Sequence, residues 1–227
     1  MFKFVQNIPI LCIVSIFSKP NGDFLLTHNR DESHLRPFSN EVKTNDYENH
    51  KWTGPMDLVS GGSWIYYSEL YACCVLNGAY TKHKHRPPYR MSRGLLILEL
   101  LKYNSIDEFV SEIELNAIEP FTMIMLKLHS TENKILVWDG REKFVENHSA
   151  DELIVRSSTP LYSEEEKQAH FNAFRDLIDT GDKAVFELHD KLKMLPNSKF
   201  PTVQTTSITQ ISHTGKQTSL KFCPIPV

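Results

Sequence analysis

A cysteine and a dense polar cluster flank the first predicted turn of the chain. Cys12 begins one apolar run, and the cluster at residues 28–32, with the sequence HNRDE, ends the next. The turn signal at residues 19–22 predicts that the two runs form an antiparallel hairpin, which sets Cys12 beside Arg30 and Asp31. This combination indicates a thiol nucleophile, because a neighbouring cation lowers a thiol pKa and a carboxylate can orient an amine.

The same residues also have plainer interpretations. Cys12 fits a buried small hydrophobe, and the charged cluster fits the solvated exit of a strand. A metal site made by Asp31, Glu32 and nearby histidines is a further alternative. It is the weakest, because the four-residue spacing of His28 and Glu32 suits a helix face while the local pattern is that of a strand. We therefore predict no metal and no other cofactor.

Two glycine-bordered segments flank a second predicted hairpin. The sequence GGSW at residues 61–64 precedes its first strand, and LNGA at residues 76–79 ends its second. Glycines at strand ends serve tight turns, but they also bring backbone N–H groups close to a ligand, as an oxyanion hole requires. The basic stretch at residues 80–90 that follows fits either a solvated loop or a site for an anionic substrate group.

Short strands and amphipathic helices must position these residues. Strands are predicted at residues 12–17, 24–28, 64–67, 71–76, 121–128, 134–138, 143–145, 153–157, 207–211 and 219–222. Helices are predicted at residues 94–102 after a Ser92 cap, from Ser105 to 113, 163–177 and 182–192, whereas residues 28–50 are expected to be irregular. This order predicts one α+β domain over residues 1–227.

Composition excludes several classes of protein. With 41% hydrophobic and 23% charged residues, the 227-residue chain is neither collagenous nor disordered, and its formal charge of −3 gives no global field for nucleic acid. The four cysteines form no CxxC pair, which favours reduced thiols. The apolar run within residues 1–17 is too short to span a bilayer, so we expect a cytoplasmic protein without stable membrane insertion.

The polar cluster and seven further motifs, in this order, resemble the NRDE family, which is related to the eukaryotic transport and Golgi organisation 2 proteins. The family takes its name from the tetrapeptide at residues 29–32. The further motifs are GGSW at 61–64, LNG at 76–78, SRG at 92–94, EPF at 119–121, WDG at 138–140, SSTPLY at 157–162 and VQTTSI at 203–208. The resemblance covers about residues 12–222.

This resemblance implies a four-layer αββα sandwich similar to that of the N-terminal-nucleophile (Ntn) hydrolases. In the cysteine amidases of that superfamily, the thiol of the first residue attacks an amide carbonyl. Its free α-amine, with a pKa of about 7.7–8.0, serves as the base. The resemblance makes Cys12 the nucleophile and Asp31 the residue that orients its amine. Arg30 would support the thiolate, and the Asn77 N–H would donate to the oxyanion. The substrate-binding residues expected on the same basis are Asn29, Glu32, Gly62, Trp64 and Ser158.

Three features depart from those amidases. Cys12 follows eleven residues instead of one Met, so residues 1–11 are expected to be an extension or propeptide, unless translation begins at Leu11. Ser158 stands near the position of an asparagine, and residues 205–209 hold no arginine.

The sequence leaves two functions open. One is a cysteine hydrolase of amide bonds in a small N-acyl or cyclic amide substrate. The other is a non-enzymatic binding or trafficking factor for haem or lipid-like ligands. No oligomeric state is predicted.

Overall fold

A computed structural model describes residues 12–81, 83–158, 164–178, 180–196, 198 and 201–226. The expected extension at residues 1–11, the expected helix cap Ser163 and residues 159–162 of one family motif lie outside this part of the chain. The described strands form two antiparallel sheets, of five and seven strands, and the described helices lie around them. The predicted α+β class is therefore confirmed.

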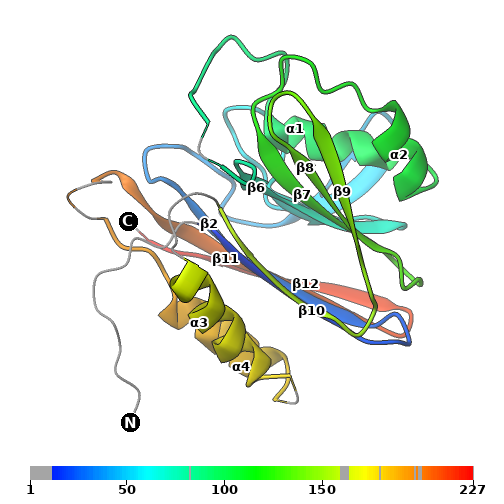
Figure 1. Ribbon diagram of the computed structural model, residues 1–227, viewed down its shortest axis with the longest axis vertical. Coiled ribbons are helices and arrows are strands. Elements are labelled where there is room, and N and C mark those ends of the chain that lie inside the picture. The colour runs from blue at the N-terminus through cyan, green and yellow to red at the C-terminus, as the bar shows by residue number, and fades with distance from the viewer. Residues whose placement is uncertain are drawn as a thin grey trace.

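The strand order of the five-stranded sheet is β10-β1-β2-β11-β12 (Figure 1). Its strands are β1 (Ile13–Ser18), β2 (Phe24–Ser33), β10 (Leu153–Ser157), β11 (Val203–Thr214) and β12 (Gln217–Pro224). The seven-stranded sheet follows chain order from β3 to β9. Its strands are β3 (Lys43–Tyr47), β4 (His50–Gly54), β5 (Ile65–Tyr67), β6 (Tyr71–Asn77), β7 (Phe121–Lys127), β8 (Asn133–Trp138) and β9 (Lys143–His148).

The helices fall into two groups, one beside each sheet (Figure 1). α3 (Glu164–Arg175) and α4 (Asp182–Lys191) lie against the five-stranded sheet. α1 (Arg93–Leu96), a 3₁₀ helix (Ile97–Lys102) and α2 (Ile106–Glu112) lie beside the seven-stranded sheet. Both predicted caps, Ser92 and Ser105, are confirmed, because each hydroxyl accepts a hydrogen bond from a backbone N–H three residues later at 3.1 Å. None of the described helices is long and apolar enough to cross a bilayer.

Side chains of β1 and β2 alternate between two hydrophobic cores, as the two-residue period of a strand requires. Ile13 and Leu25 pack with Phe174 in a small core beneath α3 and α4. Val14 and Leu26 belong to a larger core that includes residues of both sheets. The predicted burial of the first strand on both faces is confirmed, and each face of this sheet carries its own polar cluster at one end.

The prediction that residues 28–50 are irregular is wrong. β2 continues to Ser33 because the twelve-residue strand β11 pairs with it along its full length, which satisfies the backbone of its polar end. β3 and β4 also form within this stretch. β3 is a largely exposed edge strand, so its sequence KTNDY lacks the apolar alternation by which a strand is identified. The single helix predicted at residues 94–102 is instead α1 followed by the 3₁₀ helix.

Candidate functional site

A cavity of about 550 Å³ lies at the end of the β1–β2 hairpin, where the five-stranded sheet meets the β5–β6 hairpin and the start of α1. Residues from both sheets line it. Six of the nine predicted site residues are among them: Cys12, Arg30, Asp31, Glu32, Trp64 and Asn77. The elements that the sequence placed far apart therefore converge on one site.

The predicted pairing of Cys12 with Asp31 is confirmed. In the hairpin, Val14 lies opposite His28. The same register, continued by two residues, sets Cys12 opposite Arg30. The Asp31 backbone N–H donates to the Cys12 sulfur at 3.2 Å, and the Cys12 thiol donates to the Asp31 carbonyl oxygen at 3.5 Å. The Cys12 backbone N–H donates to the Asp31 carboxyl group. This nitrogen is a peptide nitrogen here, and it occupies the place of the α-amine in a chain that would start at Cys12.

Burial sets the protonation of this pair. It raises the pKa of the Cys12 thiol to about 12, and the negative charge of Asp31 adds to the increase. Burial also raises the pKa of the Asp31 carboxyl to about 8, although hydrogen bonds from Thr205 and the Cys12 N–H oppose it. Thr205 Oγ1 donates to Asp31 Oδ1 at 2.5 Å. At neutral pH the thiol holds its proton, so a nucleophilic role requires a base beside it.

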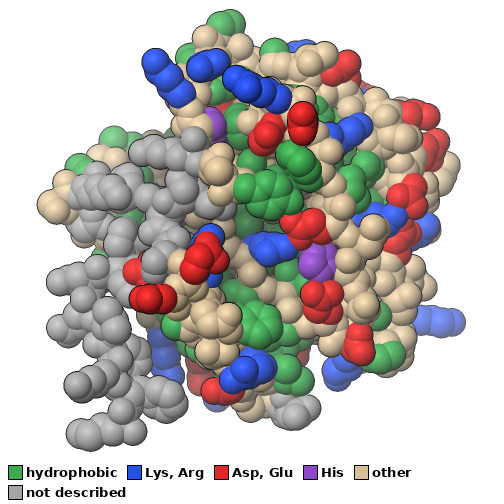
Figure 2. Space-filling view, viewed as in Figure 1, with side chains coloured by type: hydrophobic (Ala, Val, Ile, Leu, Met, Phe, Trp, Pro, Cys, Tyr) green, Lys and Arg blue, Asp and Glu red, His purple; other side chains and the backbone are tan. Residues whose placement is uncertain are grey.

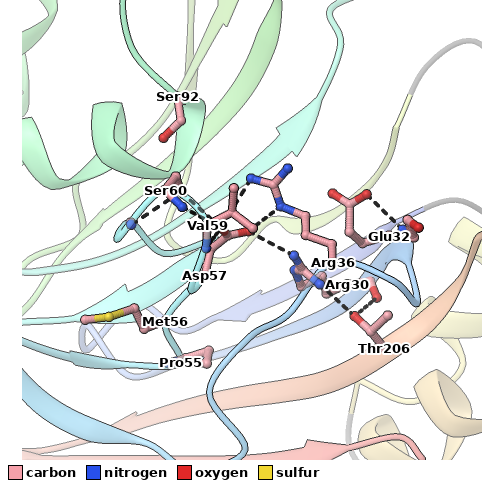
Figure 3. Close-up of polar contacts among 12 residues, drawn as sticks. Arg30, Glu32, Arg36, Pro55, Met56, Asp57, Val59, Ser60, Ser92 and Thr206 are labelled. Atoms are coloured by element: carbon pink, nitrogen blue, oxygen red, sulfur yellow. Dashed lines mark hydrogen bonds and ion pairs between the residues drawn. The ribbon is translucent and has the colours of Figure 1, made fainter. Parts of the chain in front are cut away.

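Arg30 is held in a buried ion-pair cluster with Asp57 and Arg36 (Figure 3). Arg30 donates to Asp57 at 3.2 Å and to the Thr206 hydroxyl at 3.0 Å. Its guanidinium carbon lies 4.3 Å from the centre of the Trp64 ring, a cation–π contact. Its hydrogen bonds therefore go to the protein scaffold, and any support of a Cys12 thiolate acts through space.

Two carboxylates act on the two guanidinium groups of this cluster. Arg36 Nε donates to Asp57 at 2.5 Å, so Arg30 and Arg36 share that carboxylate, and Glu32 acts on both guanidinium groups through space. Asp57 also accepts hydrogen bonds from the backbone N–H groups of Val59 and Ser60. Because Arg36 is partly exposed and lines the cavity, its guanidinium group can contact an anionic group of a ligand.

The backbone N–H of Asn77 is directed toward the cavity by strand alternation. In β6, the Val75 N–H donates toward β5 and the Gly78 N–H donates toward β7. Asn77 is two residues after Val75, so its N–H points to the same side of β6 as the Val75 N–H. The paired residues of β5 stop at Ile65, opposite Cys74, and do not extend to Asn77. Asn77 also lines the cavity, and its role as an oxyanion donor stays a prediction.

The other three predicted site residues do not line the cavity. The Asn29 side chain points to the opposite face of the sheet, where its amide donates to the His189 carbonyl oxygen at 2.9 Å. A Cβ at Gly62 would overlap the Gly94 backbone, so glycine permits the contact between this loop and α1. The Ser158 N–H donates to the Cys12 carbonyl oxygen at 3.0 Å. Its buried hydroxyl lies close enough to the Cys12 sulfur to lower the thiol pKa, although it forms no hydrogen bond of good geometry with the described residues.

A second polar cluster lies on the face of β1 and β2 that packs on α4. Ser15 Oγ lies 2.8 Å from His189 Nε2, and His189 Nδ1 lies 2.9 Å from Asn29 Oδ1. All three residues are completely buried. Burial lowers the His189 pKa to about 3, so the imidazole is neutral and joins the two strands to the helix by hydrogen bonds.

Four further residues that the sequence did not single out as site residues line the cavity: Arg36, Asp57, Arg93 and Glu119. Glu119 pairs with Arg93 at 3.0 Å and with His83 and His85 of the basic stretch at 3.2 and 3.0 Å. These contacts tie the basic loop to the cavity rim. Figure 2 shows Lys and Arg side chains gathered at the top of this face, over the loop that Figure 1 draws between β6 and α1. The signal in the sequence was their place in the family motifs: Arg93 and Glu119 belong to two of them, and Arg36, with Pro37, follows the tetrapeptide at residues 29–32.

The metal alternative finds no ligand set in the part of the chain that the structure describes. There, no group of three His, Cys, Asp or Glu side chains is arranged to hold a metal ion. The proposed ligands His28 and Glu32 lie on β2, a strand, and not on a helix face. All four cysteines are free.

Comparison with known proteins identifies the family. No curated protein matches the chain. The family model described as Transport and Golgi organisation 2 matches residues 11–225, so the match begins one residue before Cys12 and includes every residue of the cavity. The chain thus belongs to the Transport and Golgi organisation 2 family, the TANGO2 or NRDE family, as its motifs predicted.

Proposed function

We propose that the protein is a cysteine amidohydrolase of the Ntn type, active in a form whose first residue is Cys12. The observation that carries the proposal is the double contact of Cys12 with Asp31, through sulfur and through nitrogen, at the wall of a cavity. The start of the family match at residue 11 supports it. We also propose that the two sheets and their flanking helices form a single domain of the αββα sandwich type.

The proposed reaction has two steps. The Cys12 sulfur bonds to the amide carbonyl carbon while the thiol proton passes to the α-amine of the same residue. The C–N bond then breaks, the leaving amine takes that proton, and a thioester remains on Cys12. Water attacks the thioester, releases the carboxylic acid and returns the proton to the thiol. Each proton is accounted for by one base, whose pKa of about 7.7–8.0 matches a neutral working pH.

The raised thiol pKa explains why the base must be so close. A thiol with a pKa of about 12 cannot ionise at neutral pH without a proton acceptor beside it. In a chain starting at Cys12, Asp31 would face an α-amine in place of a peptide N–H, and this amine becomes an ammonium group when it takes the thiol proton. The Asp31 carboxylate would stabilise that positive charge and hold the amine next to the sulfur.

The cavity favours a small anionic amide as substrate. A volume of about 550 Å³ is within the range of small-molecule sites. The partly exposed Arg36 guanidinium group at the cavity suits a carboxylate, and the thiol must reach an amide carbonyl. An N-acyl amino acid carries both groups. We therefore propose this class as the substrate.

The test compares the full chain with a variant in which a single Met precedes Cys12. Both are incubated with a panel of N-acyl amino acids, and the released amine is measured; iodoacetamide labelling of Cys12 is followed by mass spectrometry. We expect turnover and labelling only when Cys12 is the first residue. Cys12→Ala should abolish both, and Cys223→Ser serves as the matched control. A folded chain with a free Cys12 amine that neither turns over nor labels would contradict the proposal.

The alternative is a binding factor without turnover. The high thiol pKa in a chain that keeps residues before Cys12 favours it, because such a chain has neither a thiolate nor an α-amine at the site. The cavity would then hold a haem or lipid-like ligand. Co-purification of such a ligand, lost in Trp64→Ala, would support this function, whereas hydrolysis of N-acyl amino acids would exclude it as the sole role.

A further inference from the structure

His28 is a buried imidazole without a hydrogen-bond partner in the cavity wall. It lies on β2, is 1% exposed and lines the cavity. Neither ring nitrogen has a partner with good hydrogen-bond geometry among the described residues, although the Val75 backbone lies close enough to raise the pKa of the ring. Buried polar groups are normally paired, and an unpaired one costs free energy, so a ring placed this way at a cavity indicates a ligand contact.

Other polar atoms in or beside the cavity wall are buried without a partner among the described residues. Trp64 Nε1, which can only donate, is one of them in the wall itself. The Thr209 hydroxyl, which belongs to the β11 residue opposite His28, is another. Asp31 Oδ2 is a third, and it also lines the cavity. Trp64 Nε1 and a His28 N–H are therefore donors that an acceptor oxygen of a ligand can satisfy.

The register places His28 close to the thiol. Val14 pairs with His28, so Cys12, two residues earlier on the same face, is its diagonal neighbour. Diagonal neighbours in an antiparallel pair are about 7–8 Å apart at the backbone, within reach of a long or aromatic side chain. A group bound to the Cys12 sulfur is therefore within reach of the imidazole.

The imidazole is neutral at physiological pH. Burial lowers its pKa to about 3, and the charge of Arg30 contributes in the same direction. A neutral ring offers one N–H donor and one acceptor nitrogen. Such a ring is suited to donate to a carbonyl oxygen, while the carboxylate of the ligand is left to the partly exposed Arg36.

We propose that His28 donates its ring N–H to the carbonyl oxygen of the substrate bond that Cys12 attacks. It would act together with the backbone N–H of Asn77, which lines the same cavity. This inference rests on the proposed function and names the contact that orients an N-acyl amino acid in the site.

The first test compares a histidine-to-leucine substitution at the cavity, His28→Leu, with the same substitution on the other side of the sheet, His189→Leu. His28→Leu removes two unpaired buried nitrogens, so its melting temperature should equal or exceed that of the wild type. His189→Leu leaves Ser15 and Asn29 unpaired, so its melting temperature should fall. In the chain that starts at Cys12, His28→Leu should lower kcat for N-acetylglycine by about 100-fold or more, the usual loss for one oxyanion donor, with a smaller change in KM. Folded His189→Leu should keep its kcat. A His28→Leu variant with wild-type kcat would overturn the proposal.

The second test measures binding without turnover. In protein with ¹⁵N-labelled histidine, N-acetylglycine and N-hexanoylglycine should shift the ring resonances of His28 and leave those of His189 in place. Cys12→Ala should give the same shift, because the contact does not need the thiol. A shift without turnover in any variant would contradict the hydrolase and retain the His28 contact. If neither probe shifts the His28 ring resonances, the inference is overturned. The same conclusion holds if the ring is bonded only to water.

Discussion

The two faces of the β1–β2 hairpin carry polar clusters with similar residue types and opposite properties. On the helix face, Ser15, His189 and Asn29 form a hydroxyl–imidazole–amide array in which the ring bonds both neighbours. On the cavity face, Cys12 contacts Asp31, while His28 has no partner among the described residues. The first array has the bonding order of a catalytic triad, but it is completely buried. Burial and pairing, more than residue types, separate a structural network from a reactive site.

The difference between the faces is one of unsatisfied groups. A paired buried network stabilises the fold, because removing one member leaves the others without partners. Unpaired groups that line a cavity lower the free energy of unfolding of the protein, and a ligand that binds there raises it again. Substitutions on the two faces should therefore separate activity from stability, and the following predictions test that separation.

The largest effect is expected at the thiol. In the chain that starts at Cys12, Cys12→Ala should reduce the release of amine from N-acetylglycine by about 10⁴-fold or more, since no other group replaces the nucleophile. The urea midpoint should change little, because alanine fills most of the same space. Retained turnover in the alanine variant would show that the reactive group lies elsewhere.

The next effect is a pH dependence caused by Asp31. Its folded pKa of about 8 is above its unfolded value, so between about pH 4 and 8 the folded state binds more protons than the unfolded state. Stability should fall as pH rises through this window, on the order of 1 kcal/mol per pH unit, and level off above it. Urea unfolding of wild type and Asp31→Asn at pH 5 and pH 8 measures the difference.

The Asp31→Asn variant should lack this slope. In the chain that starts at Cys12, the ammonium group beside Asp31 should flatten the slope of the wild type as well. Equal slopes for wild type and Asp31→Asn in the full chain would contradict the assignment of a raised pKa to this carboxyl group.

A smaller effect is expected on the helix face. Asn29→Ala removes both hydrogen bonds between β2 and α4 and leaves buried His189 atoms unpaired, which should lower the free energy of unfolding by about 2 kcal/mol. Chemical denaturation measures this loss, and kcat should stay near the wild-type value. A large loss of kcat at unchanged stability would instead return Asn29 to the substrate-binding role that the sequence predicted.

The smallest effect concerns substrate charge. Arg36→Gln removes the partly exposed guanidinium group that would contact the carboxylate, while Arg30 keeps its pair with Asp57, so KM for N-acetylglycine should rise about tenfold, or about 1.4 kcal/mol. KM for the uncharged N-acetylglycine amide should hardly change. Equal increases for both substrates would place the carboxylate away from Arg36.

Much of the site was predictable from local signals. The turn at residues 19–22 and the strand spacing fixed the partner of Cys12, because a two-residue period leaves one consistent register. The Asp57 cluster was not predictable, since Arg30 comes from β2 while Arg36 and Asp57 come from loops, and the three meet only in the tertiary structure. The sequence did not show which face of the sheet the Asn29 side chain occupies, because its partner, His189, is 160 residues away along the chain. The chemistry of His28 depends on the absence of partners, which only the packing of both sheets determines.

The contact of Gly62 with Gly94 limits how the site can be redesigned. A Cβ at Gly62 would overlap the Gly94 backbone, and a Cβ at Gly94 would lie 2.9 Å from the Ser63 carbonyl oxygen, so the spacing between this loop and α1 is fixed. Tyr89 and Met91 also line the cavity and are free of that constraint. A library for bulkier acyl groups should therefore vary those two positions and leave both glycines untouched.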